Sequence, residues 1–104
     1  MIETRTATWI ADAHDDTVTR LDPRTGAPIN TIRVGDDPRE LAFGFDSVWV
    51  TNHGDNTVSR LDEQTGKVIG APIAVGRAPL GIAAGAGAVW VANHESHTIT
   101  RIRP

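Results

Sequence analysis

Hydrophobic and polar positions alternate along the chain in short segments. Runs rich in β-branched residues lie between clusters of Gly, Pro, Asp and Asn, and no segment shows the period of an amphipathic helix. The Val48-Trp-Val50 segment is apolar on both faces, which is typical of a strand covered on both sides. The sequence therefore predicts an all-β fold.

A repeat of about 40 residues organises these segments. Trp9, Trp49 and Trp90 mark the same position in three copies, 40 and then 41 residues apart. A fixed period of this length indicates a repeat architecture. Eight residues after each tryptophan comes a threonine, which opens the segments Thr17-Val-Thr-Arg-Leu-Asp22, Thr57-Val-Ser-Arg-Leu-Asp62 and Thr98-Ile-Thr-Arg-Ile-Arg103.

Four strands are expected in the complete middle copy, and fewer in its neighbours. The first copy lacks its first strand or has it reduced to residues 1–5, and the third copy stops before its fourth strand. The expected strands are residues 7–12, 17–22 and 29–34 in the first copy, 39–43, 48–52, 57–62 and 68–75 in the second, and 80–84, 88–93 and 98–103 in the third.

Two local features refine this picture. Gly26 and Gly66 end matched Asp-x-x-Thr-Gly turns, where a positive φ is expected. The second copy carries one residue more than the first between that turn and the next Gly, in residues 67–76 against 27–35. The extra residue predicts a β-bulge in the fourth strand.

Arg20, Arg60 and Arg101 also repeat at one position within a strand. Each is expected to serve its own repeat, either by an ion pair with a carboxylate such as Asp22 or Asp62 or by stacking on a tryptophan. The three tryptophans lie among apolar neighbours inside strands and are predicted to be core residues.

Repeated four-stranded units predict a β-propeller, here one segment over residues 1–104 with about two and a half blades. Blade one covers about 1–35, blade two about 36–76 and the incomplete blade three about 77–104. A propeller closes with about 4–8 blades, and an open arc exposes apolar flanks. We therefore expect a ring formed by homo-oligomerisation. An excerpt of a longer propeller and a fragment that does not fold are the alternatives.

Strand counting predicts the ring. About ten strands per chain give about five blades from two chains. In that ring, a strand from the start of one chain would complete the three-stranded blade of the other.

A known family shares these motifs. Val89-Trp-Val-Ala-Asn93, the Thr-Ile-Thr-Arg-Ile segment after it and the connecting Val75-Gly-Arg-Ala-Pro-Leu-Gly-Ile-Ala83 resemble the YVTN/NHL-type propeller repeats, which are also those of the virginiamycin B lyase superfamily. The resemblance covers essentially the whole chain. It implies the fold but no single activity, because such blades serve many functions.

The composition of the chain excludes several classes of partner and site. The net charge of −3, with both signs mixed along 104 residues, gives no electrostatic support for a nucleic-acid partner. Without cysteine, neither a disulfide framework nor a thiolate zinc site can form. No apolar run suits a signal peptide or a membrane span, so a cytoplasmic location is expected if this is the full chain.

Candidate chemistry gathers on one face of the predicted propeller. Turns between second and third strands share a face with the links between blades, and the resemblance makes it the usual ligand face. The other interpretation is that these His, Asp and Asn residues are ordinary solvated turn residues. The polar residues expected near the axis on this face are Asp37, His53, Asp55, Arg77, His94, Glu95 and His97.

No metal site is predicted, because two histidines three residues apart in a hairpin do not converge by spacing alone. Streptogramin lyases use His and Glu from different blades with magnesium. The resemblance therefore implies Glu95 with His94 or His97 as an alternative acid–base pair and magnesium as an alternative cofactor. No contiguous lyase motif matches.

The predicted function is a binding or interaction scaffold without chemistry or cofactor of its own. Its expected partners are further copies of the chain and a protein or small-molecule ligand. A virginiamycin B lyase-like enzyme is one alternative, and a lectin-like or small-ligand module with sites at the blade interfaces is another.

Overall fold

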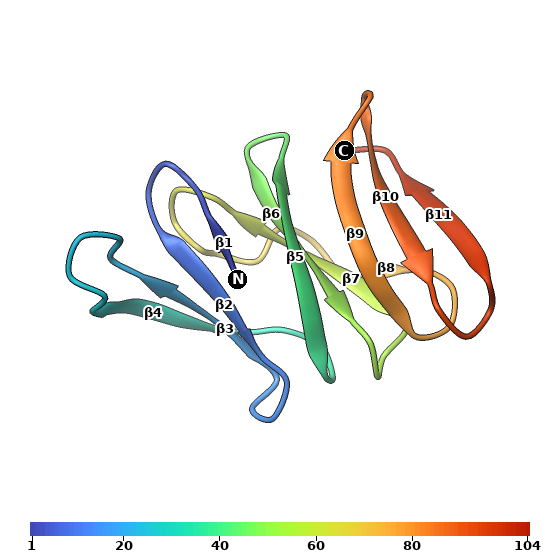
Figure 1. Ribbon diagram of the computed structural model, residues 1–104, viewed down its shortest axis with the longest axis horizontal. Helices are drawn as coiled ribbons and strands as arrows, with labels where there is room; N and C mark the ends of the chain where they lie inside the picture. Colours follow the sequence, from blue (N-terminus) through green and yellow to red (C-terminus); the bar gives the residue numbers. More distant parts are fainter.

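The computed structural model describes residues 1–104 and contains three antiparallel sheets stacked in a row (Figure 1). Each sheet is built from consecutive strands and is called a blade below; two links, residues 34–37 and 75–78, join them. Blade one contains β1 (Ile2–Glu3), β2 (Thr8–Asp12), β3 (Thr17–Leu21) and β4 (Pro28–Arg33); blade two contains β5 (Pro38–Gly44), β6 (Ser47–Asn52), β7 (Thr57–Asp62) and β8 (Ile73–Ala74); blade three contains β9 (Pro79–Gly85), β10 (Ala88–Asn93) and β11 (Thr98–Ile102).

The predicted strands are confirmed to within a residue or two, apart from the fourth strand of blade two. The middle strands agree best, because their β-branched runs are bounded by polar turns on both sides. The structure has no helix long and apolar enough to cross a membrane.

The fourth strand of blade two is interrupted, so the predicted bulge is wrong. Val68 bridges to Leu61, and Ile69 still donates to the carbonyl oxygen of Arg60 at 2.7 Å. The chain then leaves the sheet at Gly70, which has a φ of +71°, and rejoins it at β8. Pro72 has no backbone N–H to donate in this stretch, so the strand breaks instead of bulging.

The repeated arginines stack on the repeated tryptophans. The two residues face each other across the second and third strands of each blade. The guanidinium carbon lies 4.7 Å from the ring centre in the Arg60–Trp49 pair, 5.2 Å in the Arg20–Trp9 pair and 5.7 Å in the third pair. Of the two predicted roles, stacking is therefore confirmed, and none of these arginines forms an ion pair.

Two apolar layers hold the blades together. Trp9, Val18, Val48 and Val50 belong to the layer between blades one and two. The layer between blades two and three is made by Trp49, Val58, Val89, Val91 and Ile102. Trp9 and Trp49 thus each point toward the next blade along the chain.

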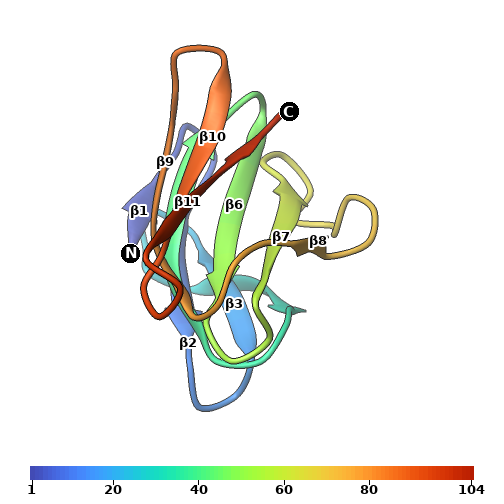
Figure 2. The ribbon, with the colours of Figure 1, turned by 90° about the vertical axis from the view of Figure 1, so that its right-hand side faces the viewer.

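Trp90 departs from the prediction that all three tryptophans are core residues. It points away from blade two, and its surface is 39% exposed. Figure 2 turns this outer face of blade three toward the viewer, and no other element covers it. Strand alternation places the side chain correctly, but no fourth blade is there to bury it.

Blade one uses the start of the chain itself. β1 pairs with β2, with Ile2 opposite Trp9. The hydroxyl of Thr4 donates to the buried carboxylate of Glu63 in blade two at 2.7 Å, and the backbone nitrogen of Thr6 does so at 3.2 Å. Within one chain, the residues at the start are therefore held by their own blade and by blade two, and a strand exchange in a ring would have to break these contacts.

Candidate functional site

The hairpins between second and third strands lie against the links, on the face that the propeller rule predicts. The backbone nitrogen of His53 donates to the carbonyl oxygen of Asp37 at 2.9 Å. In the next blade, His94 donates in the same way to Ala78 at 3.0 Å. This face therefore holds all four histidines of the chain, His14, His53, His94 and His97.

One hairpin position fastens each link to the blade before it. Asp16 and Asn56 lie seven residues after their tryptophans and have φ values of 59° and 60°. Their carbonyl oxygens accept hydrogen bonds from Val34 and Val75 at 3.0 Å. The Oδ1 of Asn56 also accepts from the nitrogen of Ala78 at 2.9 Å, and Asp16 does the same for its own link. Their first task is therefore structural.

The blade after each link holds it from the other side. Asn52 Oδ1 accepts from the nitrogen of Gly35 at 3.2 Å, and Asp55 Oδ2 accepts from the nitrogen of Asp36 at 2.9 Å. In blade three, the hydroxyl of Ser96 accepts from the nitrogen of Arg77 at 3.1 Å. Asp55, which was predicted to face a ligand, thus uses one carboxylate oxygen to bind the backbone of the link.

Asp37, Arg39 and His53 form the one ion-paired cluster on this face. Arg39 donates from Nε to Asp37 Oδ1 at 2.7 Å and from a terminal nitrogen to Oδ2 at 3.0 Å. His53 Nδ1 lies 3.4 Å from the same Oδ2. The Arg39 hydrogen bond holds the pKa of Asp37 below its usual value. Sequence reasoning missed Arg39, because Asp37 leaves strand geometry with a φ of 57°, where strand alternation predicts no pairing.

Asp36 lies among other carboxylates. Desolvation raises its pKa, and the charges of Asp16, Asp55 and Asp37 raise it further. Its carboxylate lies so close to Gly54 that a Cβ at that position would collide with it. The glycine therefore keeps space for this side chain. No three His, Asp or Glu side chains are grouped so that they could hold a metal ion.

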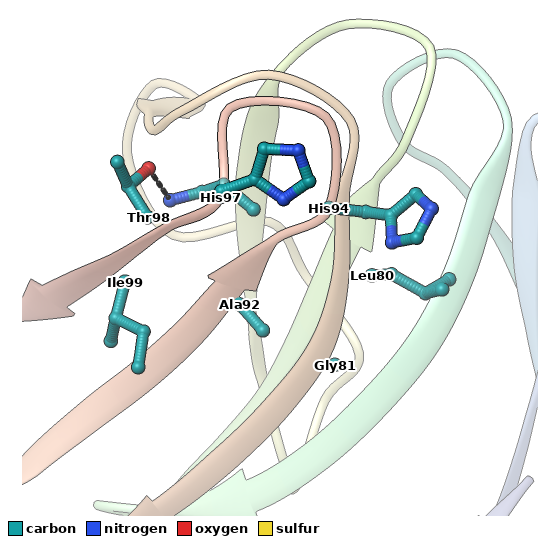
Figure 3. A pocket seen from close by; sticks show the side chains of 8 residues that line it. Leu80, Gly81, Ala92, His94, His97, Thr98 and Ile99 are labelled. Carbon is teal, nitrogen blue, oxygen red and sulfur yellow. Dashed lines mark hydrogen bonds between the residues drawn. The ribbon is translucent and has the colours of Figure 1, made fainter.

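His94 and His97 line a separate pocket of about 330 Å³ on blade three (Figure 3). Leu80 of β9, Ala92 of β10 and Ile99 of β11 form its apolar part. Of the remaining predicted residues, Arg77 and Glu95 are exposed and do not line it. The structure thus places the seven predicted residues on one face, but divides them between the Asp37–His53 cluster, the link contacts and this pocket.

Known proteins share the architecture. No family model matches the chain, and no curated protein does. Hydrazine synthase of Kuenenia stuttgartiensis superposes with a TM-score of 0.73 and 22% identity, covering 92% of this chain and 32% of its own. A catalytically inactive virginiamycin B lyase from Staphylococcus aureus, solved with quinupristin, gives 0.71 and 18%, covering 92% and 37%. The fold is a partial β-propeller.

These similarities confirm the β-propeller fold that the repeat pattern predicted, and virginiamycin B lyase is among the structures that share it. The dihydro-heme d1 dehydrogenase NirN gives a further match, with a TM-score of 0.66 and 16% identity over 94% of this chain and 26% of its own. The chain spans between 26% and 37% of the length of these three structures. At these identities, the likeness shows the fold alone.

Proposed function

We propose that the chain is a propeller scaffold without chemistry of its own, and that two copies associate through their blade flanks to form a closed ring. The observation that supports this proposal is the uncovered flank of blade three. It repeats, position by position, a flank that is buried inside the same molecule.

Blade two provides the template. Trp49 and Val58 are completely buried on the flank that faces blade three. The side chains that cover them are Val89, Val91 and Ile102. Blades two and three thus already form this interface once within a single chain.

Blade three presents the same flank without a cover. Trp90 and Ile99 take the positions of Trp49 and Val58, and they are 39% and 72% exposed. Soluble proteins rarely leave contiguous apolar patches of this kind uncovered unless the patch binds something. The flank is therefore suited to receive another blade.

Blade one carries the matching surface. Its outward-facing strand residues alternate with the buried Trp9 and Val18. They correspond in the repeat to the residues with which blade three covers blade two. These four residues are Thr8, Ile10, Thr19 and Leu21, at the positions of Val89, Val91, Thr100 and Ile102.

The blade count favours two copies. Each chain supplies three sheets and 11 strands, so two copies give six blades, where the sequence had predicted five. Six lies within the range of about 4–8 blades that closes a propeller, whereas the nine blades of three copies lie outside it. Head-to-tail contact between unlike flanks closes when the rotation per blade suits.

The ligand face supports a scaffold more than a catalyst. The carboxylates of Asp16 and Asp55 accept from backbone nitrogens of the link, and Asp37 pairs with Arg39. The lyase alternative pairs Glu95 with a neighbouring histidine, but His94 and His97 face a pocket to which Glu95 does not contribute. A general base has to reach the proton that it removes.

Light scattering on a size-exclusion column tests the proposal. The chain is expected to have twice its 11.1 kDa mass. Ile99→Asp places a charge on one flank and Ile10→Asp on the other, and each is expected to give monomers. Val68→Asp, at an exposed residue on the outer edge of blade two, is the matched control and should leave the dimer intact. A wild-type monomer with cooperative unfolding would overturn the ring.

A further inference from the structure

The outer edge of β11 is open where the other blades carry a fourth strand. In blade one, Val18 of β3 lies opposite Ile32 of β4, and in blade two, Val58 of β7 lies opposite Ile73 of β8. The equivalent residue of blade three is Ile99, which has no strand beside it on that edge. An open edge presents unpaired backbone groups that favour another strand.

The link that follows each fourth strand also has an empty counterpart. The nitrogens of Val34 and Val75 donate to the carbonyl oxygens of Asp16 and Asn56, both at 3.0 Å. His97 stands at the same repeat position, with the same left-handed backbone at a φ of 54°. Its carbonyl oxygen accepts no hydrogen bond. Blade three therefore keeps an acceptor in place without a donor.

The pocket continues this edge. Ile99 belongs both to β11 and to the pocket lining, which His94 and His97 complete at the hairpin (Figure 3). In blade two, the residue equivalent to Ala92 is Thr51, whose hydroxyl donates to the carbonyl oxygen of Leu80 in the next blade at 3.0 Å. The pocket is thus the place where, elsewhere in the molecule, the following chain segment packs.

We propose that the β11 edge and this pocket together bind an extended peptide segment of the form Ile-x-Val-Gly-x-x-Pro. Residues 32–38 and 73–79 have this form and occupy the equivalent places in blades one and two. The bound strand adds to the sheet by backbone hydrogen bonds, and its isoleucine covers Ile99. Its valine nitrogen donates to the carbonyl oxygen of His97, and its Gly-x-x-Pro part enters the pocket.

This site goes beyond the proposed ring. The ring covers the flank of blade three, whereas the peptide pairs with the open edge of β11. Ile99 takes part in both contacts, as Val58 does in blade two, where it packs against blade three and lies opposite Ile73 of β8. The two contacts are therefore compatible, and the mass of the assembly tests the ring while peptide binding tests the site.

A peptide with the sequence of residues 27–38 is the probe, because β4 is an uninterrupted strand with the required form. It is labelled with fluorescein and titrated with the full chain, with anisotropy as the readout. Saturable binding of one peptide per chain is expected. Two altered peptides, one N-methylated at Val34 and one carrying Ile32→Asp, are each expected to bind about tenfold more weakly, since they lose a hydrogen bond or an apolar contact.

The variant His97→Asn tests the same site from the protein side. It installs the residue that blade two uses, where Asn56 Oδ1 accepts a second link nitrogen at 2.9 Å. Binding of the parent peptide is expected to tighten about fivefold, as one added neutral hydrogen bond implies. Neither the flank nor the Trp90–Arg101 stack is altered by this change.

The outcomes are distinct. Equal binding of the parent and N-methylated peptides, or the absence of saturable binding, would refute the site. A dimeric chain that binds no peptide would support the ring and refute the peptide site. A monomeric chain that binds the parent peptide but not the altered ones would refute the ring and support the peptide site.

Discussion

Replacing Trp49 by alanine tests the stacked-blade core most directly. Trp49 is completely buried between blades two and three, its indole nitrogen donates to the carbonyl oxygen of Gly44 at 3.0 Å, and Arg60 stacks on its ring. A buried aromatic side chain covers about 150–250 Å², which corresponds to roughly 4–6 kcal/mol at about 25 cal/mol/Å². This is an upper bound, and Trp→Ala changes in cores cost about 3–5 kcal/mol.

Trp90→Ala is the matched comparison within the same molecule. Trp90 makes the same indole hydrogen bond, to Gly85 at 3.0 Å, and carries the same stacked arginine. Because its surface is 39% exposed, about three fifths of the apolar contribution is at stake, or roughly 2–3 kcal/mol. The two substitutions are therefore expected to differ by about 1–2 kcal/mol in a single chain.

Urea unfolding followed by circular dichroism measures this difference, at a protein concentration where light scattering shows monomers. A loss of several kcal/mol is a large part of the stability of a small domain, so Trp49→Phe is measured in parallel as a milder change. If Trp49→Ala left the unfolding midpoint unchanged, Trp49 would be exposed and the strand register would be wrong. If Trp90→Ala cost as much as Trp49→Ala in monomers, the open flank would be wrong.

Three further substitutions test polar contacts at the links and between blades one and two. Asp36→Asn should raise the free energy of unfolding at pH 7 and should have no such effect at pH 3. The reason is that the pKa of Asp36 is raised in the folded chain, so its charged form destabilises the fold only at pH values above that pKa. Urea titrations at both pH values check this. Burial raises the pKa of Glu63, but the hydrogen bonds from Thr6 and Thr4 together lower it below its usual value. The carboxylate therefore contributes stability that is lost as the pH falls through this lowered pKa. Glu63→Gln should weaken the fall of the thermal unfolding midpoint in acid, which melting curves at several acidic pH values measure. Asn56→Gly should lower the free energy of unfolding by about 1 kcal/mol, because the hydrogen bond from Ala78 is lost. Asn56→Ala should lower it by about 1–2 kcal/mol more, because a φ of 60° is unfavourable for alanine.

The strands and their stacking were predictable because they depend on short-range patterns that occur three times. Alternation fixes which side chains share a face, so Trp9 and Arg20 had to meet once their strands paired. The positive φ of Gly26 and Gly66 followed from their turns in the same way. The break at Gly70 did not, because an extra residue permits either a bulge or an interruption and only Pro72 decides between them.

The candidate site was less predictable, because its polar residues serve contacts between segments far apart in the sequence. Asp16 and Asn56 hold nitrogens about 20 residues away, and their shared repeat position was the one signal available. Arg39 was not predicted as a site residue for a different reason. Its partner Asp37 lies at a strand start whose backbone breaks the alternation on which sequence reasoning depends.

The copies of the repeat differ in the residues that surround the start of each inner strand. Asp37 and Arg39 form an ion pair where the first link enters blade two, and the same two positions at the second link are Ala78 and Leu80. The exchange removes both charges together, so no carboxylate is left without its partner. Leu80 then lines the apolar part of the pocket. The histidine that contacts Asp37 in one copy, His53, becomes in the next copy His94, a pocket residue with no acidic neighbour at that position. The same scaffold thus holds an ion-paired cluster at one link and a pocket with an apolar part beside the next, and this pocket is where the proposed peptide segment would dock.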